Sequence, residues 1–566
     1  MEKVRDDDNE ICTNSGLFED IVLRRIGPID NMDSTDEYER LIPEENGKRN
    51  GNELAPNVEY SEYNRTGNED NGNYDEAVEA AGIGKFTWLL AFVCGWANAS
   101  DSVEIVSVSF LLPAAEQDLN LSSTDKGVLN SIIFVGMLVG SLLWGSLADI
   151  QGRRKVLIYS LSVNALFGLL SSFAQEFWLF LILRFFSGVG VGGSVPAIFS
   201  YFGEFQMRQR RGMMISIVAT FWLAGNILTA GLAWAIIPSN LGTDHDEDSR
   251  FNYESWRVFV AFCTIPSATS VLTFLVLPES PKFLLETGRA EEALEVMRKV
   301  FVWNNMGTKL DYPIAVLLPS SKSKTSTIDE TKKRSIRACC TETGAEIVTI
   351  IKANIKLFLP PLTRVSVAMN VIIFCLAFGF YGLWMWFPQL FQEAETQGSV
   401  CVKSGANITK PDNSTGPDTQ IYTDAFYTSL ANLPGNLITI ILMDVVGRKA
   451  ILCSSLVLSG VGVFFIYLVK TRTQVLIMSC LFSGISVMAW NAISVLGVEM
   501  YPTSIRGTAL GFQSVSNRIG AIFGNLIFGA LIDTNCAIPI LTVAAMLAIG
   551  GIVTLTLPNT LKISLK

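Results

Sequence analysis

The chain has 566 residues, of which 49% are hydrophobic and only 17% charged, and its formal net charge is −10. Residues 1–82 contain 22 acidic and 8 basic residues, so this segment carries −14 and the remainder of the chain carries +4. A mean hydropathy of +0.36 indicates a membrane protein, and the absence of a concentrated basic face argues against nucleic-acid binding.

The N-terminal segment, residues 1–82, is rich in Asn, Asp, Glu and Gly and poor in large apolar residues. Such a composition cannot bury enough apolar surface to offset its ordering entropy, so it predicts a disordered, acidic cytosolic tail. Within the tail, Glu37, Leu41 and Ile42 fit an acidic dileucine sorting signal for a coat adaptor, although so short a pattern also arises by accident.

Twelve apolar segments follow, each long enough to cross about 30 Å of hydrocarbon. They lie near residues 86–112, 127–148, 156–174, 177–201, 213–236, 256–277, 364–390, 423–443, 450–469, 473–496, 508–531 and 536–557. This pattern predicts an all-α membrane protein with two six-helix lobes, 83–277 and 364–557, joined by a central loop, 278–363, and followed by a tail, 558–566. Basic residues in the short loops predict that the central loop and both termini lie in the cytosol. The apolar segments between them would be surrounded by membrane lipid.

The loop at 391–422 falls on the opposite side of the membrane. It contains two acceptor sequons for N-linked glycans, at Asn407 and Asn413. Cys401 in this loop and Cys536 in the last outer loop would pair in an oxidising lumen or remain separate thiols.

One charged pattern occurs twice, at a fixed offset of 295 residues. Asp149, Gly152, Arg153 and Arg154 recur as Asp444, Gly447, Arg448 and Lys449, while Glu204 and Arg211 recur as Glu499 and Arg506. The shared offset indicates a duplicated half, as in two-lobed carriers. We interpret these residues as a gate in which glycine permits a tight turn with positive φ; the alternative is a charge cluster that only fixes topology.

These motifs resemble those of the major facilitator superfamily. The run from Gly145 to Lys155 resembles its loop signature, and the run from Pro278 to Phe283 resembles the sugar-porter signature after span six. Arg184 with Gly188, Gly190 and Gly192 resembles the fourth span of that group, which assigns Arg184 to the gate.

Three further segments, 233–238, 255–260 and 490–492, resemble the synaptic vesicle glycoprotein 2 family, which is related to sugar and organic-ion transporters. The resemblance covers residues 86–557 and implies charged loops that hold the outward-facing state. Vertebrate members carry a long glycosylated luminal domain where this chain has only the loop at 391–422, so roles tied to that domain, including toxin reception, do not carry over.

Asp101 and Glu104 are candidate binding residues because both lie within the first apolar segment. A spacing of three places both carboxylates on one helical face, and acids at membrane depth usually face a cavity or a partner. The pair would bind a proton or a cation. The alternatives are a buried structural pair and two acids that lie nearer the outer surface.

Aromatic residues gather in the seventh segment, where Tyr381 and Trp384 would bind a sugar or an organic cation or form part of an interfacial belt. The resemblance adds Trp222 and Trp490 as tryptophans of the family's drug-binding cavity. Ser494 stands where the family has an acid, so Asn491 and Ser494 keep the polarity of the site but not its charge.

The sequence therefore predicts a carrier that moves a small polar or charged organic solute by alternating access, with or without coupling to protons. It would lie on a secretory, synaptic or endosomal vesicle, or at the plasma membrane. One alternative is a carrier-shaped vesicle protein that regulates exocytosis through protein contacts, and another is an organic-cation carrier. We expect no enzymatic activity, no cofactor and no metal site.

Overall fold

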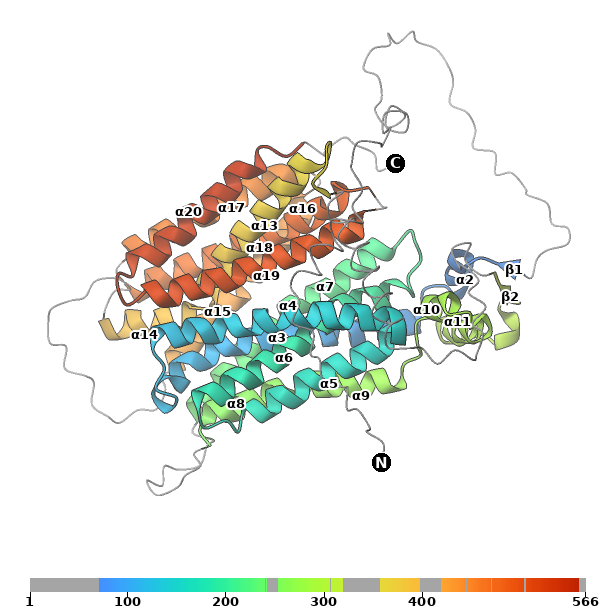
Figure 1. Ribbon diagram of the computed structural model, residues 1–566, viewed down its shortest axis with the longest axis horizontal. Helices are drawn as coiled ribbons and strands as arrows, with labels where there is room; N and C mark the ends of the chain where they lie inside the picture. Colours follow the sequence, from blue (N-terminus) through green and yellow to red (C-terminus); the bar gives the residue numbers. More distant parts are fainter. Residues whose placement is uncertain are drawn as a thin grey trace, which may run out of the picture. The chain divides into compact units, whose positions relative to one another are not determined.

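The computed structural model describes residues 71–239, 241, 253–305, 307–318, 357–397, 419–443, 445–469, 471–502 and 505–558. All of them belong to one compact unit, Thr66–Lys566. Two helical bundles lie side by side in this unit, one blue to green and one yellow to red in Figure 1.

The N-terminal lobe contains six membrane-length columns. Its helices are α3 (Lys85–Asp118), α4 (Ser123–Gln151), α5 (Arg153–Ser171), α6 (Phe177–Gly203), α7 (Arg211–Ile236) with the 3-10 turn η2 (Ile237–Ser239), α8 (Ser255–Cys263) and α9 (Ile265–Val276). Helices α8 and α9 form one column that breaks just before Pro266, which cannot donate a backbone hydrogen bond.

The C-terminal lobe repeats this arrangement. Its helices are α13 (Thr363–Trp384), α14 (Phe387–Gln397), α15 (Thr419–Leu430), α16 (Asn432–Leu442), α17 (Arg448–Leu468), α18 (Arg472–Glu499), α19 (Arg506–Leu531) and α20 (Ala537–Thr554). Helices α13 and α14 form one column, as do α15 and α16, so the structure confirms the predicted fold of twelve columns in two lobes.

Ten of the columns in the described part of the chain are apolar enough to cross a membrane by length and composition. Helices α5 and α19 are the two that fall short. Helix α5 begins with three basic residues, and α19 carries a polar stretch from Gln513 to Arg518. Helix α5 packs against α6 and α9, and helix α19 packs against α4 and α13. Part of each helix surface therefore faces protein, and that part need not be apolar.

Glycines bring α4 and α6 into backbone contact in the N-terminal lobe. A Cβ added at Gly140 would lie 2.1 Å from the carbonyl oxygen of Val189, and one at Gly192 would lie 2.4 Å from that of Met137. Small residues four apart permit such close crossing of membrane helices. This packing fixes α6 against α4 and thereby orients the polar side chains of α6.

A small unit, on the side predicted to be cytosolic, forms around α2 (Tyr74–Ala81), α10 (Pro281–Glu286) and α11 (Ala290–Asn305), with the 3-10 turn η3 (Lys309–Asp311) and a parallel pair of strands, β1 (Asn71–Gly72) and β2 (Val316–Leu317). Figure 1 shows it at the ends of the N-terminal bundle. Residues 71–82 therefore belong to an ordered unit, and the prediction that the disordered tail extends to residue 82 is wrong for this stretch.

The physical reason is local sequence pattern. Asn73 caps α2 through a capping box with Glu76, and the apolar face of α2, which includes Ala77 and Val78, packs against α11. Asn304 of α11 then donates hydrogen bonds to the carbonyls at the end of α2. Two turns of amphipathic helix suffice because they dock on an existing surface.

The two lobes meet at the predicted outer ends of their helices. Ser123 of α4 donates a 2.7 Å hydrogen bond to Asp533 after α19, and Ser131 donates a 3.2 Å hydrogen bond to the carbonyl of Ile522. Between these bonds, a Cβ added at Gly127 would lie 2.8 Å from the backbone of α19. We call this contact between α4 and α19 the outer seam; it is closed in this structure.

Candidate functional site

A buried ion pair lies in the middle of the N-terminal lobe. Glu104 of α3 is 1% exposed and pairs with Arg184 of α6, which is 0% exposed. Ser187 of α6 lies 2.6 Å from the same carboxylate oxygen and 2.9 Å from the side-chain oxygen of Asn164. Arg184, predicted to act at the gate, thus lies with the candidate binding residue Glu104 and neutralises it.

Asp101 lies three residues earlier on the same face of α3. One of its carboxylate oxygens accepts a 2.7 Å hydrogen bond from Ser194 of α6, while the other is buried without a partner. Among the described residues no basic side chain forms an ion pair with Asp101, whose exposure is 0%. The two predicted acids therefore differ, because Glu104 has a counter-ion and Asp101 has none.

The aromatic candidates form a cluster in the C-terminal lobe. The ring of Tyr381 lies 5.9 Å from that of Trp490 and 4.9 Å from that of Phe134, which belongs to the N-terminal lobe. Trp384 stacks on Phe380 at 5.6 Å. The indole nitrogens of Trp384 and Trp490 are buried without a hydrogen-bond partner, so polar capacity is left unused beside the contact between the lobes.

The remaining candidates of this group lie on other elements. Asn491 follows Trp490 on α18 and donates a 2.6 Å hydrogen bond to Asn436 of α16. Ser494 is exposed and donates to the carbonyl of Trp490. Trp222 is half-buried on α7, in the opposite lobe, and the described ring contacts do not join it to the aromatic cluster. The structure thus unites Tyr381, Trp384 and Trp490 but not Trp222.

The doubled charged pattern builds the same turn twice. Gly152 has φ of +98° and Gly447 has φ of +95°, which confirms the positive φ predicted for both. At Gly152 a Cβ would also lie 2.7 Å from the carboxylate of Glu279. That carboxylate accepts a 2.9 Å hydrogen bond from the first turn of α5, where negative charge stabilises the helix end.

The doubled pattern also builds the same ion pair twice. Arg153 Nε lies 3.3 Å from Glu204 Oε1, and Arg448 Nε lies 3.3 Å from Glu499 Oε1. Each pair joins the start of one helix to the end of another in the same lobe. The charges predicted to form the gate are therefore paired within lobes when the outer seam is closed.

Two further interactions occur once in each lobe. Arg154 donates hydrogen bonds of 2.9 and 2.6 Å to carbonyls at the end of α9, and Lys449 donates hydrogen bonds of 2.9 and 2.5 Å to carbonyls just beyond α20. Arg211 and Arg506 each donate a 3.3 Å hydrogen bond to the backbone carbonyl five residues earlier. The repeat in sequence is thus a repeat in geometry.

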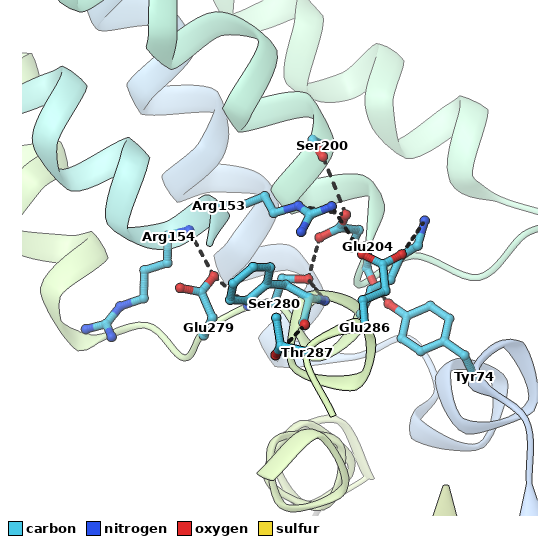
Figure 2. A network of polar contacts seen from close by, with 11 residues as sticks. Tyr74, Arg153, Arg154, Ser200, Glu204, Glu279, Ser280, Glu286 and Thr287 are labelled. Carbon is cyan, nitrogen blue, oxygen red and sulfur yellow. Dashed lines mark hydrogen bonds and ion pairs between the residues drawn. The ribbon is translucent and has the colours of Figure 1, made fainter. Parts of the chain in front are cut away.

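Further polar contacts surround the N-terminal copy, as Figure 2 shows. Ser280, at the start of α10, donates a hydrogen bond to the carboxylate of Glu204, and Tyr74 of α2 donates one to the Glu204 backbone carbonyl. Arg153 also lies 3.5 Å from Glu286. Burial raises the pKa of Glu204, although Ser280 and Arg153 oppose the shift.

Comparison with known proteins accounts for this doubled architecture. The family model described as Major Facilitator Superfamily matches residues 87–405 and 413–563, which is most of the chain. The chain belongs to the major facilitator superfamily. Its twelve columns, its doubled turns and its paired lobes are those of a membrane transporter fold.

Similar proteins within the superfamily show to which of its groups the chain belongs. Synaptic vesicle glycoprotein 2C of Mus musculus is 32% identical over 86% of this chain and 80% of its own length. Glycoprotein 2B of the same species is 33% identical, with 86% and 85% covered, and glycoprotein 2A of Rattus norvegicus is 33% identical, with 86% and 79% covered. The chain is a multi-pass membrane protein of this glycoprotein 2-like group.

Solved structures of the superfamily share the fold. The xylose transporter XylE of E. coli, in a partially occluded inward open conformation, superposes with a TM-score of 0.62 at 16% identity, covering 85% of this chain and 99% of that one. The inward open conformation of the same transporter gives 0.58 at 17% identity, covering 84% and 97%. At these identities the likeness establishes the architecture alone.

Several predicted sites fall outside the part of the chain that the structure describes. These are Glu37, Leu41 and Ile42 of the sorting signal, the sequons at Asn407 and Asn413, Cys401, and the gate residue Asp444. Asp149 is described and lies exposed at the end of α4. Cys536 takes part in a disulfide, and its predicted partner, Cys401, is not among the described residues.

Two buried polar residues were not predicted from the sequence. Asn130 of α4 is fully buried with both side-chain polar atoms unpartnered, and Arg518 of α19 is 7% exposed. The available signal for Arg518 was charge at membrane depth, the same signal that singled out Asp101. This signal was weak because the residues before Arg518 are also polar, so the segment did not resemble a membrane interior.

Proposed function

We propose that this protein is a carrier that moves a small polar or charged organic solute by alternating access, coupled to protons through Asp101. The observation that supports the proposal is the unequal state of the two acids on α3. Glu104 is neutralised by Arg184, whereas Asp101 is buried with one oxygen unpartnered and no counter-ion in the described residues. An unpaired buried carboxylate is costly, and binding a proton removes that cost.

In this mechanism the outer seam and the cytosolic gate alternate. With the seam closed, Asp101 is sealed from the outer side and holds its proton. When the seam opens, the lobes rotate as units, because their gate charges are paired within each lobe rather than between lobes. Loss of the proton would draw the charged Asp101 toward Arg184 on the facing helix, which shifts α3 against α6.

Uptake into proteoliposomes under an imposed proton gradient tests the coupling, once a solute panel has given a ligand that stabilises the purified protein by mass action. Asp101→Asn, which keeps the size and removes the titratable group, should abolish gradient-driven accumulation and retain solute exchange. Ser100→Ala is the matched control, since Ser100 is equally buried on the same helix and carries no charge. Accumulation by Asp101→Asn at the parental level would refute the coupling role.

The vesicle membrane is the proposed location, because the relatives at 32–33% identity are named synaptic vesicle glycoproteins. A second function, regulation of exocytosis without transport, is favoured by one observation. The acidic N-terminal tail leads directly into α2, whose Tyr74 bonds to the gate residue Glu204, so a partner bound to the tail would act on the gate.

Deletion of residues 1–70 separates the two functions and leaves α2 in place. If secretion fails while proteoliposome uptake is unchanged, the regulatory function is supported and is distinct from transport. If uptake alone changes, the tail serves the carrier.

A further inference from the structure

Four basic side chains in the described part of the chain are more than nine-tenths buried. They are Lys126, Arg184, Arg257 and Arg518. The first three each form an ion pair with a carboxylate of α3, as expected for buried charges. Arg518 differs, because no ion pair joins it to a carboxylate of the described residues.

The guanidinium of Arg518 is also poorly satisfied by hydrogen bonds. Nη1 donates to the hydroxyl and the carbonyl of Ser514, one turn earlier on the same helix, while Nε is buried without a partner. Among the described residues, its titratable neighbour is Tyr381 of α13. A planar fork of donors thus lies at membrane depth with most of its capacity unused.

Arg518 lies beside the contact between the two lobes. Tyr381, its neighbour on α13, contacts Phe134 of the N-terminal lobe at 4.9 Å and Trp490 at 5.9 Å. Asn517, the preceding residue, has a buried side-chain oxygen without a partner. A cation and two aromatic rings therefore lie beside the contact between the two lobes.

We propose that Arg518 binds the carboxylate of a small organic anion, whose apolar body packs against Tyr381 and Trp490. The proposal rests on the proposed carrier function and names the substrate class. A guanidinium matches a carboxylate through two parallel hydrogen bonds, which neither a neutral hydroxyl nor an ammonium group can form. A cationic solute would be repelled by Arg518, which sets this substrate class apart from organic cations.

Three probes with one common body test the substrate class. Benzoate, benzyl alcohol and benzylammonium differ in charge but share a phenyl ring, and each is added at equal concentration to the purified full-length protein in a thermal unfolding assay. Benzoate should raise the unfolding temperature and the other two should not. Equal stabilisation by benzyl alcohol, or by sodium chloride at the same ionic strength, would overturn the assignment to organic carboxylates.

Two substitutions test the residue. Arg518→Met removes the charge and keeps the length, so it should abolish the benzoate shift. Arg518→Lys keeps the charge without the fork and should weaken benzoate binding by about 10- to 100-fold, the loss of a charge-assisted hydrogen bond. Ser516→Ala is the matched control and should retain the parental benzoate shift, because the Ser516 hydroxyl lies on the same helix but donates its hydrogen bond to Asn370.

Stability without ligand distinguishes a binding role from a structural one. Arg518→Met relieves an unpaired buried charge, so its unfolding temperature without ligand should equal or exceed that of the parent. A lower unfolding temperature, or a benzoate shift that persists in Arg518→Met, would overturn the proposal.

Uptake measurements separate the proposal from the carrier function on which it rests. Benzoate binding that depends on Arg518, without uptake of any carboxylate, would support the carboxylate site at Arg518 and refute the proposed carrier function. If a neutral or cationic solute is taken up equally well by the parent and by Arg518→Met, the carrier function is supported and the carboxylate site at Arg518 is refuted.

Discussion

At the scale of single residues, the N-terminal lobe is organised by charge neutralisation on α3. Glu104 and Arg184 come from segments 80 residues apart, yet both are buried and form an ion pair. Ser187 and Asn164 extend the pair into a hydrogen-bonded network. In a medium of low dielectric such a pair is tolerated only because each charge satisfies the other.

Breaking this pair from either side should destabilise the protein strongly. Glu104→Gln leaves Arg184 unpaired, and Arg184→Gln leaves Glu104 unpaired, so each should cost about 3–5 kcal/mol. The double variant carries two neutral amides and should recover a large part of that loss. Unfolding of the three variants in detergent, analysed as a double-mutant cycle, measures the coupling.

Asp101→Asn is the control for this cycle, because Asp101 has no counter-ion to leave behind in the described residues. It should be neutral or stabilising. Additive losses in the cycle would contradict a direct pair, since coupled residues give less than the sum.

The same pair shows what the sequence could and could not predict. The presence of Asp101 and Glu104 in an apolar segment predicted buried acids on one helical face, and the structure places both there. The partner of Glu104 was missed because resemblance assigned Arg184 to the gate. Helix packing through Gly140 and Gly192 decides which face of α6 meets α3, and this packing cannot be derived from the pattern of one segment.

At the scale of elements, the sequence predicted long apolar helices well and docked polar ones poorly. Helix α2 lay in a stretch whose composition predicted disorder, but its apolar face is covered by α11. Helix α14 is a second such element, since it continues the α13 column beyond the predicted span to Gln397 and rests against α3. Both depend on partners distant in sequence, which local composition does not report.

Helix α14 carries a carboxyl group suited to respond to pH on the outer side. Burial raises the pKa of Glu393 to about 7, an effect that Asp533 and Glu116 reinforce and that Lys126 and Gln389 oppose. In an open seam this carboxyl would be hydrated and keep its ordinary pKa near 4.5. The closed seam therefore binds the proton more tightly. Its extra stability is complete below about pH 4.5 and is lost as the outer pH rises through about 7.

Acidification of the outer side from about pH 8 to 5 should thus favour the closed seam. Spin labels at the outer ends of α4 and α19, measured by distance distributions in nanodiscs, should report a growing fraction of the short distance. Glu393→Gln should remain closed across this range. If the parent shows no pH dependence, or Glu393→Gln shows the same dependence as the parent, then Glu393 does not control the seam.

At the scale of the whole molecule, duplication accounts for the scaffold and not for the chemistry. The turns at Gly152 and Gly447 and the ion pairs that follow them are equivalent in the two lobes. The unpaired buried charges are not equivalent, because Asp101 lies in one lobe and Arg518 in the other. The offset of 295 residues therefore predicted how the lobes are built, whereas the proposed binding residues occur where each lobe departs from the repeat.

A covalent bridge across the outer seam would test whether the lobes move as this arrangement requires. The side chains of Ser123 and Asp533 meet at 2.7 Å, one from each lobe, so Ser123→Cys with Asp533→Cys should form a disulfide under mild oxidation. Cleavage at a protease site engineered between residues 319 and 356, followed by a non-reducing gel, shows whether the lobes are joined. The bridged protein should lose uptake, and reductant should restore it, because alternating access needs the seam to open.

Each single cysteine variant serves as the control, since it perturbs the same contact without the bridge and should keep parental uptake in both redox states. The closed-seam bridge should leave ligand binding from the cytosolic side intact, which separates a locked carrier from an unfolded one. Parental uptake by the fully bridged protein would mean that the seam between α4 and α19 does not open during transport. The doubled gate charges would then act as fixed anchors of each lobe.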